Sequence, residues 1–302
     1  MGTIILGIFE EGLVYAIMSL GVYITYKILD FPDLSVDGTY PMGAALTAAL
    51  IAAGMHPLLA LPLAFLAGML AGTVTGLIHV KLRVRDLLSG IIVSIALYSI
   101  NLRIAGKSNV PIFSYDSIFL NPLVSRLFQG AAASFATVVI LALLVLLCKL
   151  LLDFFLQTRA GYLLRAVGSN DTLVTSLAKD KGRVKIIGLA LANGFAALAG
   201  CIMCQKQGSF DVNMGTGTIV IGLANVIIGT QIFRNVTFLK ATTAVIAGSI
   251  IYKACVAIAI NAGMAAGDLK LVTAVLFLVI LIISDLQKQK RRHRGSATGP
   301  VH

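Results

Sequence analysis

Long apolar runs separated by short polar gaps dominate the chain. A helix needs about 20 mostly apolar residues to cross the hydrocarbon core of a bilayer. The runs of suitable length are 12–29, 38–54, 57–80, 86–104, 130–152, 184–204, 216–233, 238–260 and 269–286. Because only closed hydrogen-bonded structures can cross lipid, the pattern predicts an all-α polytopic membrane protein with about 8–10 transmembrane helices.

The second run differs from the others at its start. Gly38, Pro41 and Gly43 interrupt the apolar pattern there. Irregular backbone at membrane depth is tolerated only where protein or water satisfies its peptide groups. We therefore expect a broken second helix that lines a cavity.

Small residues recur every four positions in two of the runs. Gly68, Gly72 and Gly76 form one stripe, and Ala44, Ala48 and Ala52 form another. Such stripes let helix backbones approach closely in lipid. The glycine stripe fits packing within one chain as well as a dimer seam, so the sequence leaves that choice open.

Composition supports a membrane protein and excludes other classes. The chain has 302 residues, of which 58% are hydrophobic and 12% charged, against about 25% charged in soluble domains. The net charge of +11 does not indicate a nucleic-acid partner, because the basic residues lie in the gaps between apolar runs. Cys201 and Cys204 form a CxxC, but no second pair or nearby His completes a metal site, so we expect apolar packing instead.

The distribution of Lys and Arg predicts the orientation. Most basic residues of the gaps fall on the same side as the tail 287–302, which reads QKQKRRHRGSATGPVH. Positive charge accumulates on the cytoplasmic side of membrane proteins. We expect residues 1–286 to form a single transmembrane domain, 287–302 to be a basic cytoplasmic tail that contacts membrane lipid, and the N-terminus to lie outside.

Polar residues inside the runs are candidates for function, since they are costly in lipid. Lys253, Asn193 and Asn225 lie within runs, and Glu10 and Glu11 lie next to the first run. Lys253 fits either a pathway or snorkelling to the interface, and the two Asn residues fit interhelical hydrogen bonds. No Asp, Glu or His relay crosses the runs, which disfavours a proton-coupled transporter. No catalytic or metal-binding motif is present either, so we expect neither an enzyme nor a cofactor in this chain.

Three segments resemble the branched-chain amino acid/ribose-type permease family of ABC importers. The segment 31–45 (FPDLSVDGTYPMGAA) is similar to that family's DLSVG-type stretch, and 158–170 (TRAGYLLRAVGSN) to its T-x-x-G-x-x-x-R-A-x-G-x-N segment. The segment 215–229 (GTGTIVIGLANVIIG) resembles a late small-residue helix of the family. The wording of 31–45 is most similar to a subgroup paired with tryptophan/tyrosine-type solute-binding lipoproteins.

The resemblance implies a permease subunit in the bacterial inner membrane that imports a small solute, an aromatic or branched-chain amino acid. It implies a second permease copy in a homodimer, cytoplasmic ABC ATPase subunits that bind ATP and Mg, and an external solute-binding protein. The ATPase-coupling loop would contain Thr158, Gly161, Arg165, Ala166, Gly168, Asn170 and Asp171. Candidates for the translocation path are Asp33, Ser35, Asp37, Pro41, Asn225 and Lys253.

Two alternatives remain open at this point. A stand-alone secondary transporter or channel would move solute without an ATPase. A non-transporting membrane scaffold subunit would show no flux with any partner. The outer mouth of the predicted permease would lie near 105–129 and 205–215.

Overall fold

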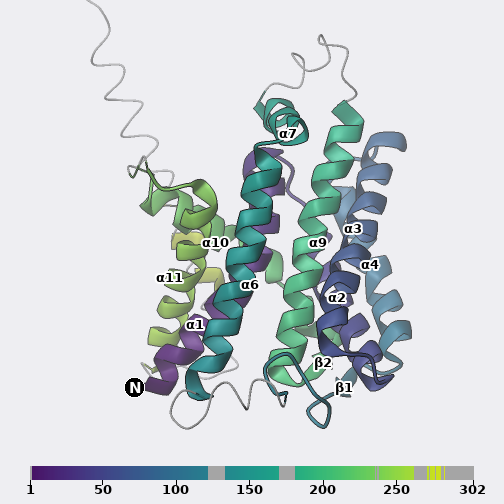
Figure 1. Ribbon diagram of the computed structural model, residues 1–302. Helices are drawn as coiled ribbons and strands as arrows, with labels where there is room; N and C mark the ends of the chain where they lie inside the picture. Colours follow the sequence, from purple (N-terminus) through teal and green to yellow (C-terminus); the bar gives the residue numbers. More distant parts are fainter. Residues whose placement is uncertain are drawn as a thin grey trace, which may run out of the picture.

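The computed structural model describes residues 2–121, 133–169, 181–234, 236, 238–261, 271, 273–275, 277–279 and 282. Helices make up about four fifths of this part of the chain, with one short strand pair (Figure 1). The elements are α1 (Gly2–Val22), η1 (Tyr23–Ile28), α2 (Val36–Ala52), α3 (Pro57–Lys81), α4 (Asp86–Ala105), β1 (Asn109–Pro111), α6 (Ala133–Leu156), α7 (Arg159–Ser169), α9 (Lys181–Gln207), β2 (Ser209–Asp211), η3 (Val212–Gly215), α10 (Thr218–Ile232) and α11 (Ala241–Asn261).

The predicted all-α polytopic membrane fold is confirmed. Within the described residues, seven segments are long and apolar enough to cross a membrane: Ile4–Ile28, Pro57–Lys81, Asp86–Ala105, Phe135–Leu156, Lys181–Gln207, Val212–Ile232 and Ala241–Asn261. The shorter α2 packs among them against α9, α4 and α3. The predicted run 269–286 lies largely outside the described residues.

The interruption near the second run lies a few residues earlier than the sequence indicated. The first span ends in the π-helical segment η1, and Asp30 then adopts a positive φ of 52°. After this turn α2 runs without a break from Val36 to Ala52, with Pro41 inside it. Pro41 lies in the second turn of α2, where it has no N–H to donate to the Asp37 carbonyl four residues earlier.

Close backbone contacts surround α9, which is the most buried span. A Cβ on Gly68 or Gly72 of α3 would meet the carbonyl oxygens of Asn193 and Leu189, respectively. A Cβ on Gly43 of α2 would likewise meet the carbonyl oxygen of Ala197. The glycine stripe of α3 therefore packs within the chain, which settles the choice that the sequence left open.

The two ends of the bundle differ in structure. At one end α7 lies across the helix termini, and at the other end lie the N-terminus and the β1–β2 ribbon (Figure 1). The ribbon is antiparallel, with Val110 opposite Phe210. It joins the segments 105–129 and 205–215, which the sequence placed together at the predicted outer mouth.

Candidate functional site

A buried polar network joins the turn before α2 to the middle of α9. The Asn193 side-chain amide donates to the Asp33 carboxylate over 2.7 Å, and its oxygen accepts from Thr39 at 2.7 Å and Ser35 at 3.0 Å. The Ser35 hydroxyl and backbone N–H also donate to Asp33, at 2.6 and 2.9 Å. All four side chains are buried. The network therefore ties the irregular segment to the central helix.

Burial also changes the acidity of the carboxyl group in this network. Removal from water raises the pKa of Asp33, while the hydrogen bonds from Ser35 and Asn193 act in the opposite direction. These bonds supply the compensation that a carboxyl group needs at a buried position.

Asp37 holds the start of α10 against the start of α2. Its carboxylate accepts from the backbone N–H of Gly217 at 3.2 Å, the N–H of Ile219 at 2.8 Å and the Thr218 hydroxyl at 3.0 Å. The two N–H groups are free backbone groups at the N-terminus of α10, which a carboxylate satisfies well. Pro41 lies beside this contact. A Cβ on Gly215, just before α10, would meet both the Asp37 carbonyl oxygen and the Pro41 ring. Two candidates for the translocation path thus meet at one junction.

The other two path candidates lie along one face of α1. Lys253 of α11 forms an ion pair with Glu11 over 2.7 Å, and its ammonium lies 4.4 Å from the centre of the Tyr15 ring. Asn225 of α10 donates to the Ser19 hydroxyl over 2.9 Å. The expected interhelical hydrogen bonds of Asn193 and Asn225 are therefore confirmed.

The helix α7 is amphipathic, and it separates the residues of the predicted coupling loop into two groups. Gly161 and Leu164 are buried, and a Cβ on Gly168 would meet the carbonyl oxygen of Ile28 in η1. Thr158 precedes the helix and accepts from the Gly161 N–H at 3.3 Å, as an N-cap does. Ala166 packs partly buried against the core.

The opposite face of α7 points away from the bundle. Arg159, Tyr162 and Arg165 are exposed on this face, where their helical spacing brings them together. Sequence reasoning selected Arg165 but missed Arg159 and Tyr162. Asn170 and Asp171 lie outside the described residues, so the structure says nothing of them.

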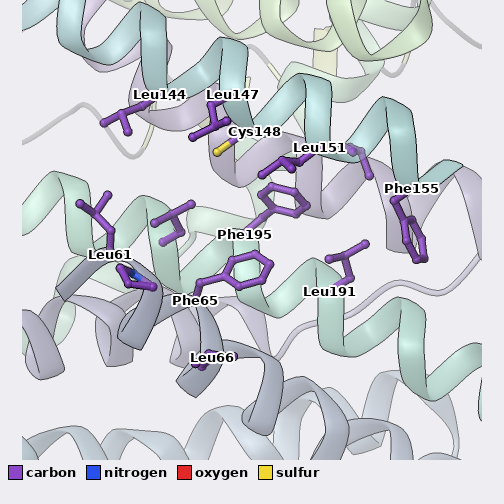
Figure 2. Close-up of a pocket in the computed structure, with 13 residues that line it drawn as sticks. Leu61, Phe65, Leu66, Leu144, Leu147, Cys148, Leu151, Phe155, Leu191 and Phe195 are labelled. Carbon is purple, nitrogen blue, oxygen red and sulfur yellow. The ribbon is translucent and has the colours of Figure 1, made fainter. Parts of the chain in front are cut away.

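A large apolar cavity of about 640 Å³ opens between α3, α6 and α9. Its lining includes Phe65, Leu147, Leu151 and Phe195 (Figure 2). The Phe65 and Phe195 rings pack edge to face, with their centres 5.5 Å apart. All of its lining side chains are apolar, apart from the thiol of Cys148. A lining of this kind suits hydrocarbon and offers no group that could bind a charged solute, so the polar junctions described above are the better site candidates.

The comparisons with known proteins agree with this architecture. Residues 4–284 match the family model described as branched-chain amino acid transport system / permease component. A tyrosine transport system permease protein of Clostridioides difficile is 46% identical over 282 residues, which cover 93% of this chain and 92% of that protein. An uncharacterised protein of Rickettsia prowazekii is 32% identical over 92% of this chain and 97% of its own length.

A more distant relative is a ribose import permease protein of Escherichia coli, 25% identical over 74% of this chain and 67% of that protein. No solved structure matches the chain significantly. The family match spans nearly the whole chain, including α1, α7, the Asp33–Asn193 network and the contact of Asp37 with α10. The chain therefore belongs to the family of permease components of the branched-chain amino acid transport system type.

Proposed function

We propose that this chain is the membrane subunit of an ATP-driven importer for an aromatic or branched-chain amino acid. The observation that carries the proposal is α7, an amphipathic helix whose exposed face holds Arg159, Tyr162 and Arg165. A separate ATPase needs such a surface to act on the spans. The resemblance to a tyrosine transport system permease supports an aromatic amino acid as the solute.

The charge distribution supports a cytoplasmic position for α7. Basic residues are much more frequent at the α7 end than at the β1–β2 end, and Lys and Arg accumulate on the cytoplasmic side. The described basic residues near the α7 end include Lys27, Lys81, Arg83, Arg85, Arg159, Arg165, Lys181, Arg183, Lys185, Arg234 and Lys240, against Arg103, Lys107 and Lys206 at the other end. In this orientation the N-terminus lies outside, the tail 287–302 lies in the cytoplasm of a bacterial cell, and residues 1–286 form the transmembrane domain.

The proposed mechanism transmits motion from α7 to the irregular segment before α2. Gly168 lies against the Ile28 carbonyl at the end of η1, and the chain then passes through Asp30 to Asp33. A shift of α7 would therefore move the segment that leads from Ile28 to the Asp33–Asn193 network. ATP and Mg would bind the partner ATPase, and a second permease copy would complete the pathway. An external solute-binding protein would dock near the β1–β2 ribbon.

A pull-down in mild detergent tests this proposal. The tagged chain is expressed with its ATPase and binding protein, and the co-purifying proteins and ATP hydrolysis are measured. We expect an ABC ATPase to co-purify, and the charge reversal Arg165→Glu to remove it. The matched control is Arg103→Glu, an exposed residue near the opposite end of the bundle, which should retain the ATPase.

Other outcomes would favour the alternatives. A chain recovered alone that still moves solute in liposomes would be a stand-alone transporter or channel. A chain that supports no flux with any partner would be a scaffold subunit.

A further inference from the structure

Three polar residues form a stripe along one face of α1, which is otherwise largely apolar. Glu11, Tyr15 and Ser19 are four residues apart and therefore share a face. Each contacts a different helix: Glu11 pairs with Lys253 of α11, Tyr15 stacks on Tyr40 of α2, and Ser19 accepts from Asn225 of α10. We call these three residues the α1 stripe.

Two of the partners on this stripe carry polar atoms that no described residue satisfies. The Asn225 side-chain oxygen is buried and accepts no hydrogen bond within the described part of the chain. The Tyr40 hydroxyl is buried too, and it lies near the Tyr15 hydroxyl without a hydrogen bond of ordinary length. Tyr40 is only 1% exposed. Buried groups of this kind are normally hydrogen-bonded, so an unpartnered one indicates a ligand or water. Both lie next to residues of one stripe, which indicates a common path.

The Glu11–Lys253 pair is open on one side only. The Lys253 side chain is 13% exposed and the Glu11 side chain 44%. Both residues lie within segments long and apolar enough to span the membrane. An ionised carboxylate facing lipid there would be costly, so the open side of Glu11 faces water or protein.

Charge balance identifies the kind of solute that could use this pair. Separating Glu11 from Lys253 leaves two uncompensated charges in a medium of low polarity. A zwitterion supplies both counter-charges at once, because its ammonium can bind Glu11 while its carboxylate binds Lys253. Net charge stays constant, and an aromatic side chain could then pack against the partly buried Tyr15 ring.

We infer that Glu11, Lys253 and Tyr40 bind the zwitterionic head group of an amino acid as it passes along the α1 stripe. This inference rests on the proposed import function. It assigns the contact to the permease itself, in addition to whatever the external binding protein recognises. The competing explanation is that the ion pair only fastens α1 to α11.

Variants of the pair separate the two explanations. Glu11→Gln combined with Lys253→Met removes both charges, and a purely structural pair tolerates such paired replacement. The charge swap Glu11→Lys with Lys253→Glu restores the attraction between the two side chains, but it exchanges the positions of the carboxylate and the ammonium that would bind the solute. We expect both variants to assemble and to take up radiolabelled L-tyrosine about tenfold more slowly, in cells that express the complete complex.

Two further variants complete the experiment. Lys149→Met is the control, because Asp153 keeps its contacts with Lys240 and Thr242, and it should leave uptake unchanged. Tyr40→Phe keeps the ring and removes only the unpartnered hydroxyl, which should preserve stability but lower uptake about threefold. Tyr40→Phe decides the question if the charge variants fail to assemble.

The outcomes distinguish this inference from the proposed function. Normal uptake in the uncharged double variant or in Tyr40→Phe, or full recovery in the charge swap, would overturn the head-group site alone. A wild-type complex that takes up neither tyrosine nor leucine would overturn the proposed function and the site with it.

Discussion

Asn193 and Asp33 are 160 residues apart in the chain, yet the amide of one donates to the carboxylate of the other over 2.7 Å. The same amide oxygen accepts from Ser35 and Thr39. One side chain of α9 therefore satisfies three polar groups of the segment that begins α2. This concentration of contacts makes Asn193 a suitable position for testing what the network contributes to stability.

Asn193→Ala should destabilise the protein by about 1–3 kcal/mol, because it removes one donor from the buried Asp33 carboxylate and one acceptor shared by two buried hydroxyls. The Ser35 and Thr39 hydroxyls keep Asp33 and the Ser35 carbonyl as acceptors. Thermal unfolding of the purified protein in detergent measures the effect. Asn261→Ala is the matched control, since Asn261 is exposed and its side chain, among the described residues, bonds to Ala257 of its own helix. An unchanged unfolding temperature for Asn193→Ala would contradict the structural importance of the network.

Gly72→Ala should separate α3 from α9, because the added methyl would meet the carbonyl oxygen of Leu189. Overpacking of this kind costs about 1–3 kcal/mol, and we expect less folded protein in size-exclusion chromatography. A Cβ on Gly7 of α1 would meet no atom within 4 Å. Gly7→Ala should therefore be neutral or slightly stabilising. Equal yields of folded protein for the two variants would show that the contact between α3 and α9 has room for a methyl group.

Asp37→Ala should expose the start of α10 to local unfolding. Loss of a helix cap costs about 1 kcal/mol, and it leaves the N–H groups of Gly217 and Ile219 without their acceptor. Hydrogen–deuterium exchange should rise in the first turn of α10 and stay constant in α4. Asp86→Ala, in the first turn of α4, removes a carboxylate that accepts from the Leu87 N–H and should not change exchange in α10. Unchanged protection of the first turn of α10 in Asp37→Ala would refute the capping role.

Gly168→Ala should uncouple ATP hydrolysis from transport. The added methyl pushes α7 away from the Ile28 carbonyl but leaves Arg165 exposed for docking. We expect the ATPase to remain bound and to hydrolyse ATP while solute uptake falls about tenfold, in line with a contact worth about 1.4 kcal/mol. Ser169→Ala is the control, since among the described residues its hydroxyl bonds to Ala166 of α7 itself. Parallel loss of ATPase binding would instead make Gly168 part of the docking surface.

The sequence predicted the spans well because membrane helices need long apolar runs, which are local features. The Gly68–Gly72–Gly76 stripe also predicted close packing correctly. It could not identify α9 as the partner, because every apolar helix in the chain offers a possible surface. The interruption was placed at Gly38 to Gly43, although the helix begins at Val36 and the turn lies at Asp30.

The candidate site was predicted in pieces. Asn225 and Lys253 were selected for their polarity within apolar runs. Four more residues were selected for their place in the interrupted region, namely Asp33, Ser35, Asp37 and Pro41. The six belong to separate junctions. Contacts such as Lys253 with Glu11 depend on how α1 and α11 pack, which no local pattern shows. One available signal was missed, because the spacing of Glu11, Tyr15 and Ser19 places three polar residues on one helical face.

The glycine contacts around α9 also limit how the protein could be redesigned. Where a backbone carbonyl occupies the space of a missing side chain, as at Gly43, Gly68 and Gly72, no substitution fits without moving a helix. A mutant library aimed at a new solute should therefore keep α9 and its glycine neighbours constant. Randomising the open side of Glu11 and the surroundings of Tyr40 would explore new chemistry on a scaffold that stays assembled.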